Sequence, residues 1–249
     1  MIPFLKSILI EVPSGKESRY PFNIPAIKGG LELKLNSFIT FLVGENGSGK
    51  STFIEAIAIQ LGLNPEGGNR YTVFNSLESE SDLSEHTFIS KGVKRIRDSF
   101  FFRAETAYSL FQEAERQKEF GGFGWAHRWS DMHKKSHGES LLEILKHRLK
   151  DGVYIFDEPE TALSVQRQLE FLSYIHQLVC NGSQLIIATH SPIILSYPSS
   201  AIFELTEEGP IEMDYKSTMS YKTMKHFIDN VNYYQDRFTG NELGLDYDD

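Results

Sequence analysis

Nine consecutive residues have the types and spacing of a phosphate-binding loop. They satisfy the pattern G-x-x-x-x-G-K-[ST] at every fixed position. An apolar run at 37–43 precedes them, and an apolar stripe at helical spacing follows from Phe53 to Leu61. The order strand, glycine loop, helix predicts a cradle of backbone N–H groups for an anion. The loop consists of Gly44, Glu45, Asn46, Gly47, Ser48, Gly49, Lys50, Ser51 and Thr52.

Within this loop, two side chains have the chemistry to bind a nucleotide with its metal. Lys50 is expected to reach the β- and γ-phosphates, and the hydroxyl of Ser51 to hold Mg²⁺. Glycine at 44, 47 and 49 lets the backbone turn tightly and point its N–H groups inward. The sequence therefore predicts ATP and Mg²⁺ as ligands.

Polar residues also end two other apolar runs. Asp157 and Glu158 follow the run at 153–156, and His190 follows the run at 184–189. Ligands of open α/β sheets bind at the carboxyl ends of the strands, so these residues are expected beside the loop. Asp157 and Ser51 would supply oxygen ligands to Mg²⁺, and Glu158 would act as general base toward a water. The alternative is a pair of solvated loop carboxylates, and the glycine loop favours the catalytic interpretation.

Length and composition indicate an ordinary globular chain. It has 249 residues, with 40% hydrophobic and 24% charged residues, enough for one large domain or two small ones. Cys180 is the single cysteine, which excludes an intramolecular disulfide and a cysteine metal site. The N-terminus lacks a signal-peptide pattern, and no apolar run approaches the roughly 20 residues that span a bilayer. A cytoplasmic location is expected.

The charge balance argues against general nucleic-acid coating. Net charge is −9, whereas such proteins usually carry a basic domain. One basic cluster is predicted to form a solvated helix face, with DNA contact as the less favoured alternative. It comprises Lys91, Lys94, Arg95, Arg97 and Arg103.

Alternation of strands and helices predicts an α/β fold with a mostly parallel sheet flanked by helices. Strands are expected at 6–12, 31–35, 37–43, 99–105, 153–158 and 184–190, and a hairpin at 201–216. Helices are expected after the loop and at 106–120, 141–149, 165–179 and about 220–236. The first two strands would form an antiparallel part, and 62–90 a surface excursion. In the 165–179 helix the apolar face is expected at Val165, Leu169, Leu172 and Val179.

Several side chains have two interpretations. Tyr20 or Phe22 is predicted to cover a sheet edge, and stacking on adenine is the alternative. His127, His133 and His137 suggest a metal site, but their spacing does not support one.

The motifs together resemble the ABC-type ATPases. Asp157 to Ser164 (Asp-Glu-Pro-Glu-Thr-Ala-Leu-Ser) resembles their second nucleotide motif and following loop, and Ala188 to Pro192 resembles their histidine switch. Lys135 to Ser140 (Lys-Ser-His-Gly-Glu-Ser) resembles their signature motif, with Glu139 where the family has Gln. The similarity is greatest to stand-alone bacterial ATPases that resemble the heads of SMC-type repair proteins.

This resemblance implies one ABC-type ATPase domain. Its nucleotide-binding core would comprise 1–75 and 150–216, its helical signature subdomain about 76–149, and its C-terminal helix and tail 217–249. His190 would sense the γ-phosphate. Ser136, Gly138 and Glu139 would contact the ATP of a second subunit in a head-to-tail homodimer. The family's glutamine-loop residue is either Glu105 or Gln112.

Three functions remain open at the level of sequence. In the first, a soluble ATPase hydrolyses ATP and its dimer acts on DNA or on a partner protein such as a nuclease. In the second, the chain is the ATP-binding subunit of a membrane transporter. In the third, it is a nucleotide-gated scaffold without turnover.

Overall fold

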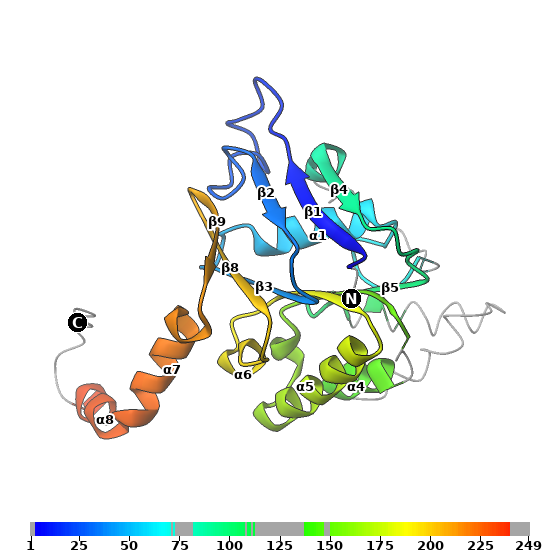
Figure 1. Ribbon diagram of the computed structural model, residues 1–249. Coiled ribbons are helices and arrows are strands. Elements are labelled where there is room, and N and C mark those ends of the chain that lie inside the picture. The colour runs from blue at the N-terminus through cyan, green and yellow to red at the C-terminus, as the bar shows by residue number, and fades with distance from the viewer. Residues whose placement is uncertain are drawn as a thin grey trace.

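The computed structural model describes residues 3–70, 72, 82–107, 109–110, 112, 137–146 and 150–239. It contains two sheets that lie on either side of helix α1, which spans Lys50–Gln60 (Figure 1). The larger sheet has the order β5-β6-β7-β3-β8-β9, and the smaller one has the order β2-β1-β4. The α/β class with a mostly parallel sheet and an antiparallel part is thus confirmed.

The larger sheet is parallel except for its last strand. Strand β9 pairs antiparallel with β8, which closes the predicted hairpin at one edge. Its strands are β5 (Asp98–Arg103), β6 (Gly152–Asp157), β7 (Gln184–Ala188), β3 (Ile39–Val43), β8 (Ala201–Thr206) and β9 (Gly209–Met213). All residues of β3, β6 and β7 are buried, as expected for central strands covered on both faces.

Each face of this sheet belongs to a separate hydrophobic core. Leu42 and Ile155 pack with α1 and the smaller sheet, whereas Phe41 and Phe156 pack with the helices on the opposite face. Those helices are α4 (His137–Lys146), α5 (Val165–Cys180) and α6 (Pro192–Leu195). The parallel strands therefore lie between α1 on one face and α4, α5 and α6 on the other. Their carboxyl ends lie along the same end of the sheet.

The smaller sheet corrects the prediction for 62–90. Its strands are β1 (Leu5–Ile10), β2 (Leu31–Lys34) and β4 (Thr87–Lys91), after a short 3₁₀ helix at Asp82–His86. The predicted excursion thus ends in a strand that pairs antiparallel with β1. Leu83 is fully buried, and the Thr87 hydroxyl donates to its carbonyl over 2.7 Å, so this segment is anchored to the core. The stretch expected as a helical subdomain, 76–149, includes β4 and β5 of the two sheets.

Helix α5 buries a face that is rotated from the predicted one, of which only Leu172 and Val179 pack against the core. Val165 and Leu169 are 66% and 56% exposed, whereas Phe171, Ile175 and Leu178 are fully buried. The predicted residues and the buried residues both recur at helical spacing. The buried set includes Phe171, whose large ring packs toward the sheet. Phe171 meets Phe156 edge to face, with ring centroids 5.3 Å apart.

Two helices replace the single C-terminal helix predicted at about 220–236. Helix α7 spans Met219–Asp229 and α8 spans Val231–Thr239, after a 3₁₀ turn at Tyr215–Ser217. Asn230 separates them because its backbone leaves the helical region, at φ −131° and ψ 39°. Its side-chain amide donates to the His226 carbonyl over 2.9 Å, a local bond that competes with helix continuation. No helix within the described ranges has the length and apolarity to cross a membrane.

Candidate active site

The glycine loop connects β3 to α1 and has the backbone of an anion cradle. Gly44, Gly47 and Gly49 have φ values of +145°, +82° and +96°, which side chains rarely permit. A Cβ on Gly49 would also lie 2.6 Å from the Ile24 side chain, and one on Gly44 would lie 2.8 Å from Ser48 Oγ. Positions 44 and 49 therefore require glycine, both because of their backbone conformation and because a Cβ would lie too close to a neighbouring side chain.

Lys50 lies at the start of α1 and points back into the loop. Its Nζ donates to the carbonyls of Gly44 and Glu45 over 2.9 and 3.0 Å. Burial lowers the pKa of its ammonium, and the negative charges of Glu158, Asp157 and Glu160 oppose that effect. Nearby, the buried Ser48 Oγ finds no hydrogen-bond partner among the described residues. A loop with an orphaned hydroxyl, three glycines of positive φ and a cation fits a polyphosphate.

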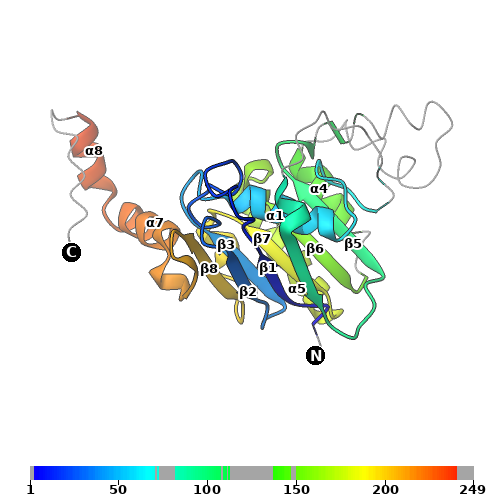
Figure 2. The same cartoon turned by 90° about the horizontal axis from the view of Figure 1, so that it is seen from above.

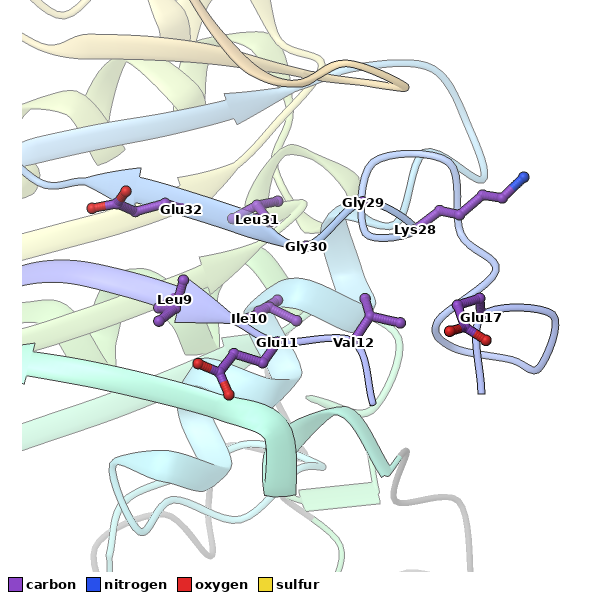
Figure 3. Close-up of a pocket in the computed structure, with 10 residues that line it drawn as sticks. All are labelled: Leu9, Ile10, Glu11, Val12, Glu17, Lys28, Gly29, Gly30, Leu31 and Glu32. Atoms are coloured by element: carbon purple, nitrogen blue, oxygen red, sulfur yellow. The ribbon is translucent and has the colours of Figure 1, made fainter. Parts of the chain in front are cut away.

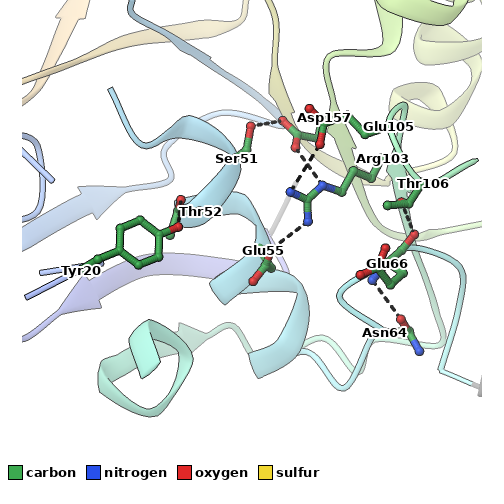
Figure 4. A network of polar contacts seen from close by, with 10 residues as sticks. All are labelled: Tyr20, Ser51, Thr52, Glu55, Asn64, Glu66, Arg103, Glu105, Thr106 and Asp157. Atoms are coloured by element: carbon green, nitrogen blue, oxygen red, sulfur yellow. Dashed lines mark hydrogen bonds and ion pairs between the residues drawn. The ribbon is translucent and has the colours of Figure 1, made fainter. Parts of the chain in front are cut away.

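Next to Lys50 on α1, Ser51 meets Asp157 at the end of β6. The Ser51 hydroxyl donates to Asp157 Oδ1 over 3.2 Å (Figure 4). The other carboxylate oxygen lies 3.8 Å from Arg103 Nε, which stands opposite Asp157 in the β5–β6 register. Burial raises the pKa of Asp157 to about 6, although Arg103 and the Ser51 hydrogen bond lower it. A hydroxyl and a carboxylate are the oxygen ligands that Mg²⁺ prefers, so this pair fits the metal.

Arg103 is the cation at the centre of this network. Its NH1 group contacts Glu55 Oε2 at 2.7 Å, and its NH2 group lies 3.7 Å from Glu105 Oε2. Burial favours the neutral form, but the surrounding carboxylates, Glu55 first among them, outweigh it, and the pKa of Arg103 is raised. Arg103 therefore holds α1, β5 and β6 together behind the loop.

Glu158 and His190 follow the ends of neighbouring strands and face each other. Glu158 Oε1 lies 3.7 Å from His190 Nε2, and both side chains are 39% exposed. Glu158 has a left-handed backbone, at φ 48° and ψ 53°, which is uncommon for a residue other than glycine. Glu160 fixes the histidine segment, since it accepts from the His190 N–H over 2.5 Å and from the Thr189 hydroxyl over 2.7 Å.

A cleft of about 300 Å³ lies along the loop, and its lining includes Tyr20, Thr52, Lys50 and Glu158. The Tyr20 hydroxyl lies 3.3 Å from Thr52 Oγ1, and its ring is 67% exposed. Phe22, by contrast, is buried against His86. Of the two aromatic residues considered for stacking, the structure brings only Tyr20 to the loop.

A larger, open hollow lies elsewhere, beside the ends of β1 and β2 (Figure 3). Its lining includes three carboxylates and one ammonium, from Glu11, Glu17, Glu32 and Lys28. Residues of the glycine loop and the carboxyl ends of the parallel strands are not among those that line it. The candidate chemistry therefore belongs to the cleft rather than to this hollow.

The signature-like segment begins α4. Gly138 is buried against the loop after β6, and a Cβ there would collide with the Ala162 carbonyl oxygen. Glu139 pairs with Arg167 of α5 at 2.7 Å. Ser136 lies outside the described residues, as do His127 and His133. Within the described ranges, groups of three or more potential metal ligands from His, Cys, Asp and Glu are absent.

Comparison with known proteins identifies the family of this site. A family model described as an AAA domain matches residues 22–208. The chain belongs to this AAA domain family. Among curated relatives, the energy-coupling factor transporter ATP-binding protein EcfA2 of Mesomycoplasma hyopneumoniae is 24% identical, over 86% of this chain and 81% of its own. The zinc import ATP-binding protein ZnuC of Photobacterium profundum is 29% identical, over 66% of this chain and 63% of its own.

Solved structures of similar chains include one described as the ATP-binding subunit of an ABC transporter. It is 16% identical, with a TM-score of 0.49, over 94% of this chain and 100% of that one. The family match and the curated relatives establish an ABC-type P-loop ATPase that binds and hydrolyses ATP.

Sequence reasoning missed several residues of this ATPase site. Arg103 was expected in an exposed basic cluster, yet it lies among three carboxylates. Arg103 ends an apolar strand, as Asp157 does, and this position was the feature of the sequence that could have predicted its place in the site. Glu55 follows Ser51 by four residues and so shares its helix face. Glu160 belongs to the same Asp-Glu-Pro-Glu run as Glu158, but only the fold shows that it reaches the next strand.

Proposed function

We propose that the cleft along the glycine loop is the ATP site. The single observation that carries this proposal is the convergence of Lys50, Ser51, Asp157, Glu158 and His190 at the ends of three adjacent strands. The loop N–H groups and Lys50 would hold the phosphates, with Lys50 exchanging its carbonyl partners for phosphate oxygens. Tyr20 would stack on adenine beside Thr52, because its exposed ring lines the cleft.

Hydrolysis requires a base near the γ-phosphate end. Glu158 would take a proton from the attacking water, or orient that water, while His190 would contact the γ-phosphate. Their separation of 3.7 Å supports a shared location for the water and the phosphate. Mg²⁺ held by Ser51 and Asp157 would neutralise charge on the phosphates. Glu160 would hold His190 in position relative to the γ-phosphate, through the hydrogen bond that it accepts from the His190 N–H.

A second subunit would complete the site. The signature residues Ser136, Gly138 and Glu139 precede or begin α4, which packs on the opposite face of the sheet from α1 (Figure 1). In the proposed head-to-tail homodimer they would contact the ATP held by the other chain. ATP binding and dimer formation would then favour each other.

The partner most consistent with the relatives is a membrane protein. EcfA2 and ZnuC are named as ATP-binding proteins of transport systems, and they align with most of this chain. We therefore propose that this ATPase is the energy-providing subunit of a transporter. This differs from the first expectation, an action on DNA or on a nuclease, which the relatives do not support.

The basic cluster also gives little support to a DNA contact. Arg103 is internal, and Lys94 pairs with Asp151 at 3.2 Å. Lys91, Arg95 and Arg97 remain exposed. They lie at the end of β4 and in the following loop, not on the predicted helix face.

The experiment uses Glu158→Gln, which keeps the shape of the side chain but cannot accept the proton. We expect normal ATP affinity and a turnover about 10²- to 10⁴-fold lower. ATP-loaded Glu158→Gln protein, crosslinked in membranes of cells that produce it, should capture an integral membrane partner. Capture of DNA in place of a membrane protein would overturn the transport assignment, and unchanged turnover would overturn the role of Glu158.

A further inference from the structure

Helices α7 and α8 form an arm that projects from the body of the molecule (Figure 2). No residue of either helix is buried. Of the fourteen exposed large hydrophobic side chains in the described part of the chain, seven lie on this arm of 21 residues. They are Met219, Met224, Phe227, Ile228, Val231, Tyr233 and Phe238.

Contacts between its own side chains give the arm a defined shape. The Tyr234 hydroxyl lies 2.8 Å from His226 Nδ1, and the Tyr234 ring centroid is 5.3 Å from that of Phe227. Both contacts join α7 to α8 across Asn230. The arm is therefore an elbow with an apolar surface already assembled, which lowers the entropy cost of binding a partner.

The energetics of so exposed an arm favour a partner that covers it. Isolated helices shorter than about 12–15 residues are marginal in water, and those of the arm have 11 and 9 residues. Monomers also rarely expose contiguous apolar patches larger than about 300–600 Å². With roughly 150–200 Å² for each of the seven side chains, about half exposed, the arm presents on the order of 600 Å². A surface of this size is typical of an interface.

The area of the arm supports a second copy of this chain as the occupant, and the charge of the arm permits it. Two such arms together would bury about 1,200 Å², the lower limit for a stable specific interface. The whole chain has a net charge of −9, which opposes association of two copies through the rest of the molecule. Residues 219–239, in contrast, hold three cations and two carboxylates. Their net charge of +1, three minus two, lets two arms approach without strong repulsion. A two-fold pairing would also present the same surface on both chains.

We propose that α7–α8 pairs with the same arm of a second copy, in the absence of nucleotide. This contact is separate from the ATP-dependent closure proposed above. It would hold two ATP sites at a high local concentration, so that closure becomes intramolecular. Hydrolysis per chain would then be independent of protein concentration down to the dissociation constant of the arms.

The test combines Ile228→Asp with Tyr233→Asp, two exposed positions on α7 and α8 at 62% and 47%. Without nucleotide, the wild type should sediment with twice the mass of the 28.4 kDa chain, and the double variant with the mass of one chain. Val93→Asp is the matched control, because Val93 is also apolar and 85% exposed but lies on the body. It should remain a dimer.

ATP binding and hydrolysis provide the second measurement. The double variant should keep wild-type ATP affinity, which shows that it folds, while its specific turnover rises with protein concentration. Wild-type turnover should be flat over the same range. A nucleotide-free wild type that is monomeric, or a double variant that remains dimeric, overturns the proposal. An arm dimer that forms while Glu158→Gln shows normal turnover would leave this proposal standing and refute only the proposed catalytic site.

Discussion

Asp157→Asn should make the metal-free protein more stable at neutral pH, although it removes a residue from the proposed active site. Burial raises the pKa of Asp157 from 3.8 to about 6. The native state then binds this proton more tightly than the unfolded chain does. Above about pH 6 the ionised carboxylate therefore lowers the free energy of unfolding, by about 1.4 kcal/mol for each pH unit that separates the two pKa values. The full effect is about 3 kcal/mol.

The sign of the pH dependence follows from the same two values. Below pH 3.8 the carboxyl is protonated in both states, so the penalty is absent. It grows as pH rises between 3.8 and about 6, and is constant above. Asparagine is neutral throughout and can still accept the Ser51 hydrogen bond, but Arg103 loses one anionic neighbour. The expected net gain is about 1–3 kcal/mol, or roughly 2–12 °C in Tm for a chain of this size.

Thermal unfolding in EDTA at several pH values measures this difference directly. The stabilisation of Asp157→Asn over wild type should be full at pH 7.5 and should shrink as pH falls toward 4. Asp151→Asn is the control, because Asp151 is one-third exposed and pairs with Lys94 near the surface. Its Tm should change little. An Asp157→Asn protein that unfolds at or below the wild-type temperature at pH 7.5 would refute burial as the dominant cause.

Four further substitutions test the remaining contacts of the site. Lys50→Ala should weaken ATP binding by at least about 100-fold in equilibrium titration, since charge-assisted contacts to phosphate are the strongest in the cleft; near-normal affinity would exclude the loop assignment. Tyr20→Ala should weaken ATP binding about 5- to 150-fold, equivalent to about 1–3 kcal/mol of base stacking, while Tyr20→Phe binds normally; equal affinity in both variants would remove Tyr20 from the site. Glu160→Ala should lower the free energy of unfolding by about 1–3 kcal/mol and reduce turnover with little change in ATP affinity, because it leaves the His190 N–H and the Thr189 hydroxyl without their acceptor; a loss of affinity equal to the loss of turnover would contradict this. Ser136→Arg, added to Glu158→Gln, should prevent the ATP-trapped closed state seen by crosslinking while single-chain ATP affinity is kept; a closed state that persists would show that Ser136 is not at the contact.

The sequence was sufficient to predict the parts of the site that follow from strand ends. Asp157 and His190 each follow a continuous apolar run, and such a run is typical of a strand buried on both faces. The glycine loop was predictable because its conformation restricts residue type at fixed spacing. These are local signals, and the topology of a parallel sheet converts them into proximity.

Features that depend on contacts between distant segments were not predictable in this way. Strand β4 has only five residues, and its pairing with β1 depends on the burial of Leu83 nearby. The face of α5 could not be chosen from periodicity, because Val165 and Phe171 both belong to regular apolar stripes. Arg103 looked like one member of a basic cluster, since a single sequence does not show which of several cations meets the buried carboxylates.

The buried charges of the site and the exposed surface of the arm are two violations of ordinary burial patterns, and both are expected at functional positions. Asp157 is 4% exposed and its burial costs stability, so a cation that binds it recovers free energy only when the site is filled. The arm exposes apolar surface that a second chain would cover. If both proposals hold, the arm keeps two chains together in every state, and the free energy of nucleotide binding is not used to bring them together. It is then available to move the two ATP sites relative to each other, which is the motion that a transport partner would require.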